Sequence, residues 1–108
     1  LTIPASQLSN DVDPNATQYI LYSNYPNPFN PSTKIVYEIS EQTHVSLTIH
    51  DIFGNVVMRL VNDFQPSGKK TVIWNGKNQQ NFKVSAGQYF YTLKTENYRE
   101  TKRMLLIK

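Results

Sequence analysis

Apolar and polar residues alternate along most of the chain from Lys34 onward. A period of two is what a strand with one buried face requires, and no segment shows the helical period of about 3.6 residues. The short apolar run at 18–22 is either a first strand or a docked segment. The alternation predicts six further strands, at 34–40, 45–50, 56–60, 70–74, 87–93 and 101–107.

Turn residues separate the predicted strands. Gly54 lies where a tight turn needs a positive φ, so the strands on either side of it are expected to form a β-hairpin. Asn75-Gly76 predicts a type I′ turn, and the polar segment 77–86 is long enough to cross from one sheet to the other. The sequence therefore predicts an all-β sandwich of two antiparallel sheets. Its expected core comprises Ile35, Leu47, Ile49, Trp74, Tyr89 and Tyr91.

A proline-asparagine run, Tyr25-Pro26-Asn27-Pro28-Phe29-Asn30-Pro31-Ser32-Thr33, precedes the first of these six strands. Proline lacks a backbone N–H and restricts the residue before it, so the run is neither a helix nor a central strand. Phe29 is the large apolar side chain inside the run and is the expected anchor to the core. The amides of Asn27 and Asn30 are expected to bond neighbouring backbone in Asx-turns. The run predicts a rigid, extended lead into the sandwich.

Residues 1–17 have the composition of a linker. They are rich in Ser, Asn, Asp, Gln and Thr, show no period, and contain the glycosylation sequon Asn15-Ala16-Thr17. The abrupt start of the chain suggests a piece of a longer protein. No apolar run approaches the roughly 20 residues that a transmembrane helix needs, so no transmembrane segment is expected.

The net charge of +3 is unevenly placed. Residues 94–108 hold five Lys/Arg and two Asp/Glu, whereas residues 1–93 hold six of each. The whole excess therefore lies in the tail. Such a tail fits either an anionic partner or a solvated edge strand whose charges prevent aggregation.

The residue types that catalysis needs are sparse. There is no cysteine, hence no thiol nucleophile, disulfide or Cys-ligated zinc. Strand parity places His44 and His50 on one face, but no third imidazole joins them and Asp51 faces the other way. Asp51, Asp63 and the asparagines offer oxygen ligands for Ca²⁺ without a diagnostic spacing. We therefore expect no enzyme, no cofactor and no metal site.

Two binding functions deserve comparison with this expectation. Nucleic-acid binding would use basic residues interleaved with aromatic ones. The aromatic residues of the tail fit core and strand packing better: Tyr89, Phe90, Tyr91 and Tyr98. A carbohydrate-binding module would expose a row of aromatics, for which Trp74, Tyr91 and Tyr98 are candidates, although a lone Trp beside a turn is more often buried. We expect no nucleic-acid partner. A carbohydrate-binding or structural accessory module of a secreted enzyme stays the alternative.

Several short motifs occur in a specific order and spacing: 24–33, Ile35-Val36-Tyr37, 45–51 with Gly54, Trp74-Asn75-Gly76, 85–91 and 101–108. Together they resemble the C-terminal sorting domain (type A) of proteins exported by the type IX (Por) secretion system of Bacteroidetes and related bacteria. The resemblance covers roughly residues 19–108. Trp74-Asn75-Gly76 and Gly87-x-Tyr89 also resemble the immunoglobulin-like part of flagellar hook-capping proteins.

This resemblance implies an immunoglobulin-like antiparallel β-sandwich of about seven strands. It implies that 1–17 links the sorting domain, 18–108, to an upstream cargo domain in cis. The expected function is that of a non-catalytic secretion signal that directs the cargo across the outer membrane. The expected partners are the secretion machinery with its outer-membrane receptor and a sortase-like cysteine peptidase, which usually removes the domain. The protein would pass through the periplasm to the cell surface or the medium.

The resemblance associates signal recognition with the terminal strands. The last strand is expected to pair with a receptor strand through its backbone, with Lys102 and Lys108 beside Met104 and Leu106 providing charge and specificity. The expected recognition residues are Gly87, Tyr89, Lys102, Met104, Leu105, Leu106, Ile107 and Lys108. The expected structural signature is Tyr25, Pro26, Asn27, Pro28, Phe29, Asn30, Pro31, Trp74 and Gly76.

Overall fold

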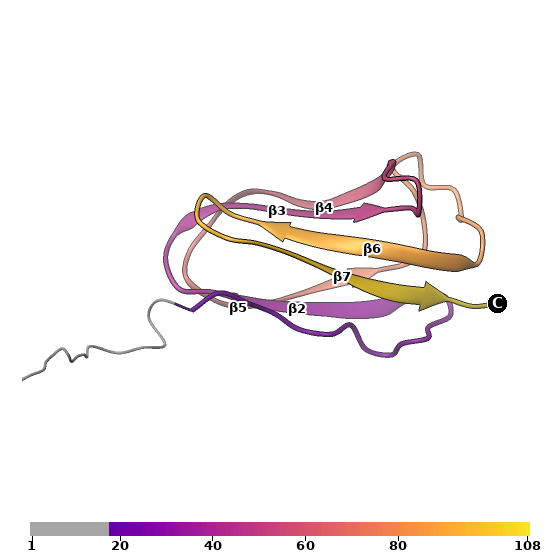
Figure 1. Cartoon of the computed structure of the whole chain (residues 1–108), viewed down its shortest axis with the longest axis horizontal. Helices are drawn as coiled ribbons and strands as arrows, with labels where there is room; N and C mark the ends of the chain where they lie inside the picture. Colours follow the sequence, from indigo (N-terminus) through magenta and orange to yellow (C-terminus); the bar gives the residue numbers. More distant parts are fainter. Residues whose placement is uncertain (1–17) are drawn as a thin grey trace, which may run out of the picture.

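The computed structural model describes residues 18–108, and these form a β-sandwich with no helix in that part of the chain (Figure 1). The predicted all-β fold is confirmed. The predicted linker at 1–17 and its sequon lie outside the described residues. The seven strands are β1 (Ile20–Leu21), β2 (Thr33–Ile39), β3 (Thr43–His50), β4 (Val56–Gln65), β5 (Gly68–Trp74), β6 (Gly87–Lys94) and β7 (Arg99–Leu106).

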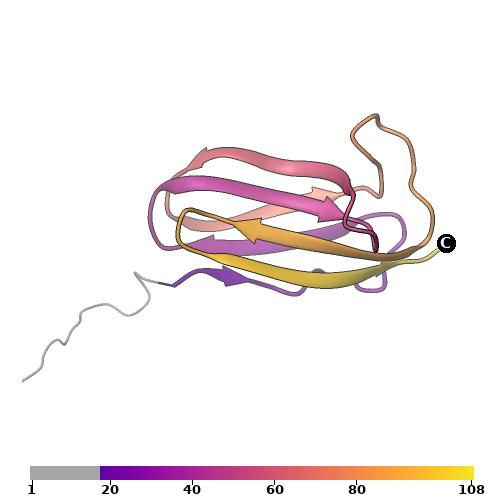
Figure 2. The ribbon, with the colours of Figure 1, turned by 45° about the horizontal axis from the view of Figure 1, so that its top comes forward.

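Two antiparallel sheets form the layers of the sandwich (Figure 2). One has the strand order β1-β2-β5, and the other has the order β4-β3-β6-β7. The hairpin predicted around Gly54 joins β3 to β4, and the segment 77–86 crosses between the sheets, both as predicted. The loops 51–55 and 77–86 and Lys108 lie at one end of the sandwich, which we call the distal end (Figure 1). Strand β1 begins at the other, proximal end.

The core contains all six side chains that the alternation predicts, each at most 6% exposed. Phe29 is 1% exposed, which confirms its role as the anchor of the proline-asparagine run. Its ring centroid lies 5.7 Å from that of Trp74, which in turn lies 5.4 Å from that of Tyr89. Aromatic rings at such separations attract one another beyond their area burial, so this trio ties the run to both sheets.

Two tyrosines of β6 use their hydroxyl groups to fix neighbouring backbone. Tyr89 donates a hydrogen bond of 2.7 Å to the carbonyl of Ser85, which is the geometry of a tyrosine corner. Tyr91 donates to the carbonyl of Tyr22 at 2.8 Å and accepts from the backbone N–H of Asn24 at 2.9 Å. Because Tyr91 belongs to the four-stranded sheet, these bonds join it to the segment after β1. Burial raises the pKa of Tyr91 to about 12.

The prediction of a type I′ turn at Asn75-Gly76 is wrong. That turn needs a positive φ at both residues, and here Gly76 has φ 74° while Asn75 has no positive φ. The reason is that β5 does not fold back on β6 but runs into the crossing segment. A Cβ on Gly76 would lie 2.9 Å from the carbonyl oxygen of Pro31. Glycine is therefore required here by the close approach of the proline-asparagine run.

Candidate functional site

The candidate site is the outer edge of β7, which pairs only with β6 in the four-stranded sheet. The proline-asparagine run covers the C-terminal part of this edge. Phe29 donates its N–H to the carbonyl of Leu105 at 3.0 Å and accepts the N–H of Ile107 at 2.9 Å. The side-chain oxygen of Asn27 accepts the N–H of Leu105 at 3.0 Å. We call these three hydrogen bonds the clamp.

The clamp changes the expected role of the run. The prediction that the amides of Asn27 and Asn30 bond neighbouring backbone is wrong. The Asn27 oxygen bonds Leu105 instead, and no hydrogen bond of the Asn30 side chain is found within residues 18–108. The run begins at a local network in which Asn24 donates to the hydroxyl of Thr33 at 2.9 Å, and Thr33 donates to the carbonyl of Pro26 at 2.8 Å. These bonds join the two ends of the run to each other, and its middle lies against β7.

The N-terminal part of β7 has an uncovered edge. Successive residues of a strand direct their N–H and C=O groups to opposite sides. Since Leu105 directs both groups away from β6, so do Thr101 and Arg103, and Arg99 at the start of the strand. No hydrogen bond from another segment within residues 18–108 reaches these groups. We call the backbone of Arg99, Thr101 and Arg103 the open edge.

The side chains of the open edge are exposed and basic. Arg99, Thr101 and Arg103 all lie on the outer face of the sheet. The carboxylate of Glu100, on the opposite face, lies 3.6 Å from the Lys102 ammonium and accepts a hydrogen bond from Tyr98. In the described part of the chain neither arginine forms an ion pair. The open edge therefore presents two uncompensated positive charges.

The surroundings of the open edge leave room for a partner. A hollow of about 430 Å³ beside it is lined by Ser23, Phe90, Thr101, Lys102 and Arg103. Burial, together with the hydrogen bond to Glu100 and its charge, raises the pKa of Tyr98 to about 12. Its hydroxyl therefore stays protonated, and able to donate to Glu100, further into the alkaline range than an ordinary tyrosine. An exposed strand edge with free backbone groups can accept an additional strand, and its charges favour an acidic one.

The structure separates the predicted recognition residues into distinct environments. Tyr89, Met104 and Leu106 are core residues, at most 6% exposed. The expectation that Met104 and Leu106 offer their side chains to a receptor is wrong for the folded domain, because alternation along β7 turns them inward. Leu105 and Ile107 have exposed side chains, but their backbone is in the clamp.

The remaining members of that set are Gly87, Lys102 and Lys108. Gly87 starts β6 and is half-buried, and Lys102 is half-buried beside Glu100. Lys108 is exposed beyond the end of β7. Sequence reasoning missed Arg99, Thr101 and Arg103. The signal that could have found them is the alternation of exposed polar side chains at these three positions.

Other candidate residues are placed as follows. Trp74 and Tyr91 are fully buried, so the row of exposed aromatics considered for carbohydrate binding does not form. His44 and His50 lie on the outer face of β3, and the His44 ring contacts Phe64 edge-on. Residues 18–108 contain no group of three His, Cys, Asp or Glu arranged to hold a metal. The same residues include no helix long and apolar enough to cross a membrane.

Comparison with solved structures shows the same fold in three bacterial proteins. PorZ of Porphyromonas gingivalis, an essential bacterial surface component of the type-IX secretion system, is 21% identical with a TM-score of 0.58, over 82% of this chain and 11% of PorZ. Dimeric latent PorU of the same organism is 16% identical with a TM-score of 0.65, over 82% of this chain and 9% of PorU. FlgD of P. aeruginosa is 20% identical with a TM-score of 0.56, over 83% of this chain and 65% of FlgD.

The chain thus spans about a tenth of the length of PorZ and of PorU, and less than two thirds of that of FlgD. No curated protein sequence matches it. The family model of the FlgD Ig-like domain matches residues 30–98, more than half of the chain, including β2 to β6. With its two antiparallel sheets and its tyrosine corner, the chain belongs to the FlgD Ig-like domain family.

Proposed function

We propose that residues 18–108 are a non-catalytic sorting domain that directs a cargo protein across the outer membrane through the type IX secretion system. The observation that carries this proposal is the open edge, a row of unpaired backbone groups flanked by Arg99 and Arg103. The secretion machinery would add an acidic strand to it. The fold shared with part of PorZ, a type-IX secretion component, supports the assignment to this system.

The position of the family match supports a specialised role for the two segments on either side of it, which we call the flanks. The match runs from residue 30 to residue 98, so it leaves out Asn27, Phe29 and the whole of β7. The clamp and the open edge are therefore built mainly from segments outside the residues that the family model matches. In our proposal the core supplies a stable support, and the two flanks supply the surface that is recognised.

The geometry also suggests that the cargo and the secretion machinery contact different parts of the domain. The described part begins beside β1 at the proximal end, where an upstream cargo domain would be attached (Figure 1). The open edge runs along the side of the sandwich, so an outer-membrane receptor can reach it while cargo is present. A sortase-like cysteine peptidase would then act in the linker at 1–17. The domain would travel through the periplasm to the cell surface or the medium.

The test is export of a reporter enzyme fused to the N-terminus of the full chain, in a host that has this secretion system. Thr101→Pro removes an outward N–H from the open edge, and an edge strand tolerates proline there. We expect this variant to retain the reporter in the periplasm. Thr101→Ala is the matched control, because it removes the side chain and keeps the backbone donor, and we expect it to be exported.

The outcomes separate recognition at the edge from sorting itself. Export of a folded Thr101→Pro fusion at the wild-type rate would show that the edge is not the docking site. Surface display of the reporter without residues 18–108 would show that the domain is not a sorting signal. Arg99→Glu with Arg103→Glu should slow export more than Lys34→Glu with Lys69→Glu, two exposed lysines of the other sheet, if the partner strand is acidic.

A further inference from the structure

The distal end exposes large apolar side chains. At the tip of the β3–β4 hairpin, Ile52 is 62% exposed and Phe53 is 82% exposed. Phe82, in the crossing segment, is 68% exposed, and Ile107 is 43% exposed. Figures 1 and 2 show that both loops and the C-terminal residues lie at this end. Large apolar groups gathered at one end of a small domain mark an interaction surface.

These side chains are displayed by ordered loops. In the hairpin, the Asp51 carboxylate accepts the N–H groups of Phe53 and Asn55, both at 2.9 Å. In the crossing segment, the Asn78 side chain accepts the N–H of Phe82 at 3.0 Å. Gln79 donates its N–H to the carbonyl of Val57 at 3.0 Å, which fastens this loop to β4. The aromatic rings are thus held outward by backbone that is itself fixed.

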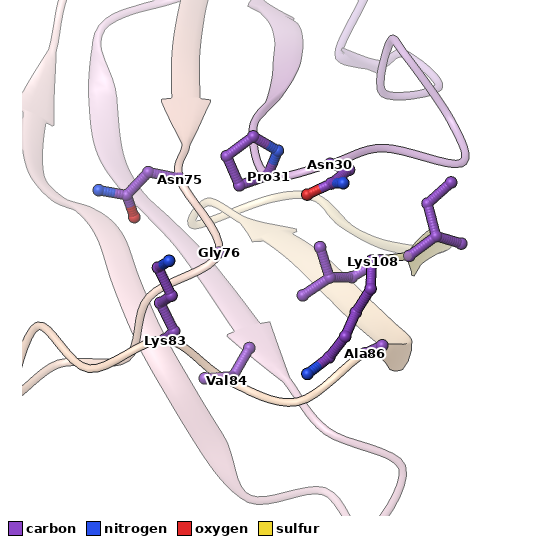
Figure 3. Close-up of a pocket in the computed structure, with 10 residues that line it drawn as sticks. Asn30, Pro31, Asn75, Gly76, Lys83, Val84, Ala86 and Lys108 are labelled. Atoms are coloured by element: carbon purple, nitrogen blue, oxygen red, sulfur yellow. The ribbon is translucent and has the colours of Figure 1, made fainter.

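Lysines accompany the apolar side chains. Lys77 and Lys83 face each other across an antiparallel bridge in the crossing segment, an arrangement of like charges that is unfavourable without a counter-charge. Lys83 and Lys108 border a hollow of about 280 Å³ from two sides (Figure 3). Among the described residues none of these three lysines forms an ion pair. The apolar part of this hollow comes from Pro31, Val84, Ala86, Leu106 and Ile107.

Acidic residues are segregated from this end. Asp51 is the one acidic side chain there among residues 18–108. Its Oδ1 accepts the backbone N–H groups of Phe53 and Asn55, and its Oδ2 accepts from the side-chain amide of Asn55. The other acidic side chains lie on strand ends and turns toward the proximal end: Glu38, Glu41, Asp63, Glu96 and Glu100. The distal end therefore combines positive charge with apolar rings, whereas at the proximal end the acidic side chains are mixed with basic ones, Lys69, Lys94 and Arg99.

We propose that the distal end binds an anionic lipid surface, with Phe53 and Phe82 in the headgroup region and Lys77, Lys83 and Lys108 on lipid phosphates. Bilayer interfaces take up aromatic rings, and each lysine near an anionic leaflet adds to binding. The same end thus offers both features that an anionic bilayer interface selects, rings that can enter the headgroup region and lysines without a counter-charge. The proposal is independent of the sorting role, because it uses none of the groups of the open edge.

The test is co-sedimentation of the full 108-residue chain with vesicles of phosphatidylcholine alone or mixed with phosphatidylglycerol. We expect binding to the mixed vesicles that weakens with salt, and little binding to phosphatidylcholine. Phe53→Ala with Phe82→Ala, and separately Lys83→Gln with Lys108→Gln, should each weaken binding about tenfold or more. The controls are Phe64→Ala, an exposed ring at the proximal end, and Lys69→Gln with Lys94→Gln, which should bind like wild type.

Each contrary result would overturn the proposal. Absence of sedimentation of the folded chain with the mixed vesicles rules out a lipid surface as the partner. Equal binding to both vesicle types removes the role of the lysines. If the distal and the control variants lose vesicle binding equally, the chain binds through its overall net charge, and the distal end is not a specific binding site. Circular dichroism checks that every variant is folded; all the substituted side chains lie on the surface.

Discussion

The side-chain oxygen of Asn27 accepts a hydrogen bond of 3.0 Å from the backbone N–H of Leu105, 78 residues further along the chain. An amide oxygen here does what a neighbouring strand would do, because it satisfies an edge N–H at the point where Phe29 begins to pair with the same residue. The proline-asparagine run thus pairs with the C-terminal part of the β7 edge, even though its prolines prevent it from being a regular strand.

Replacing Asn27 by Ala should destabilise the domain by about 1 kcal/mol, the usual net value of one hydrogen bond. Chemical denaturation measures this loss, and amide exchange at Leu105 should become faster. Asn30→Ala is the matched control, because it removes an amide from the same run and no hydrogen bond of the Asn30 side chain is found within residues 18–108. Equal losses in the two variants would show that the clamp bond is not what stabilises the run.

Tyr91→Phe should cost about 1–3 kcal/mol, because it leaves the N–H of Asn24 buried without an acceptor. Asn24 is 4% exposed, so water cannot replace the lost hydroxyl without opening the layers. The free energy of unfolding from urea denaturation gives the loss. Tyr25→Phe is the control, since Tyr25 is 78% exposed and should tolerate the change. A loss below a few tenths of a kcal/mol in Tyr91→Phe would contradict the bridging role.

Stability should fall at alkaline pH. Burial raises the pKa of both Tyr37 and Tyr91 to about 12 from the ordinary value of 10.0. Between these values the unfolded chain has released the protons that the folded chain still holds, so the free energy of unfolding decreases as pH rises from about 10 to about 12. The contribution is fully present below pH 10. Denaturation midpoints measured from pH 8 to 12 would show this, and Tyr91→Phe should flatten the decline.

Substitutions at two glycines distinguish the cost of backbone strain from the cost of a steric clash. Gly54 (φ 87°) has nothing within 4 Å of an added Cβ, whereas at Gly76 (φ 74°) that Cβ would lie 2.9 Å from the Pro31 carbonyl. Gly54→Ala should cost about 1 kcal/mol, the usual penalty for a left-handed residue with a side chain. Gly76→Ala should cost at least about 1 kcal/mol more, because backbone must move. Equal thermal unfolding temperatures for the two variants would argue against this contact.

The strands and the core could be predicted because their determinant is local. Burial in a strand has a period of two, so the residues around Leu47 and Tyr91 reveal their inward faces without knowledge of partners. The clamp could not be predicted in this way. The amide of Asn27 has the same chemistry whether it bonds its neighbours, as expected, or Leu105, and only the assembled sandwich decides between them.

The open edge also could not be predicted from local sequence alone. The charge excess of the tail pointed to the last strand, but not to the edge groups of that strand that stay free. Which groups are free depends on where Phe29 lies, because its pairing with Leu105 and Ile107 covers one part of the edge and leaves Arg99, Thr101 and Arg103 uncovered. Likewise, Met104 and Leu106 could be assigned to the core only once β7 was placed over the interior.

The clamp has a consequence for the time at which the domain becomes complete. Contacts between residues so far apart in sequence cost the most chain entropy to form, and these contacts need Leu105 and Ile107 to be present. A chain that ends before Leu105 cannot make the clamp, and it leaves Phe29 without its backbone partners. We therefore expect that a nascent or truncated chain does not present a finished edge. The edge is thus finished only when the segments around Phe29 and Leu105 are both present, and a docking partner would find the clamp only in chains that extend through Ile107.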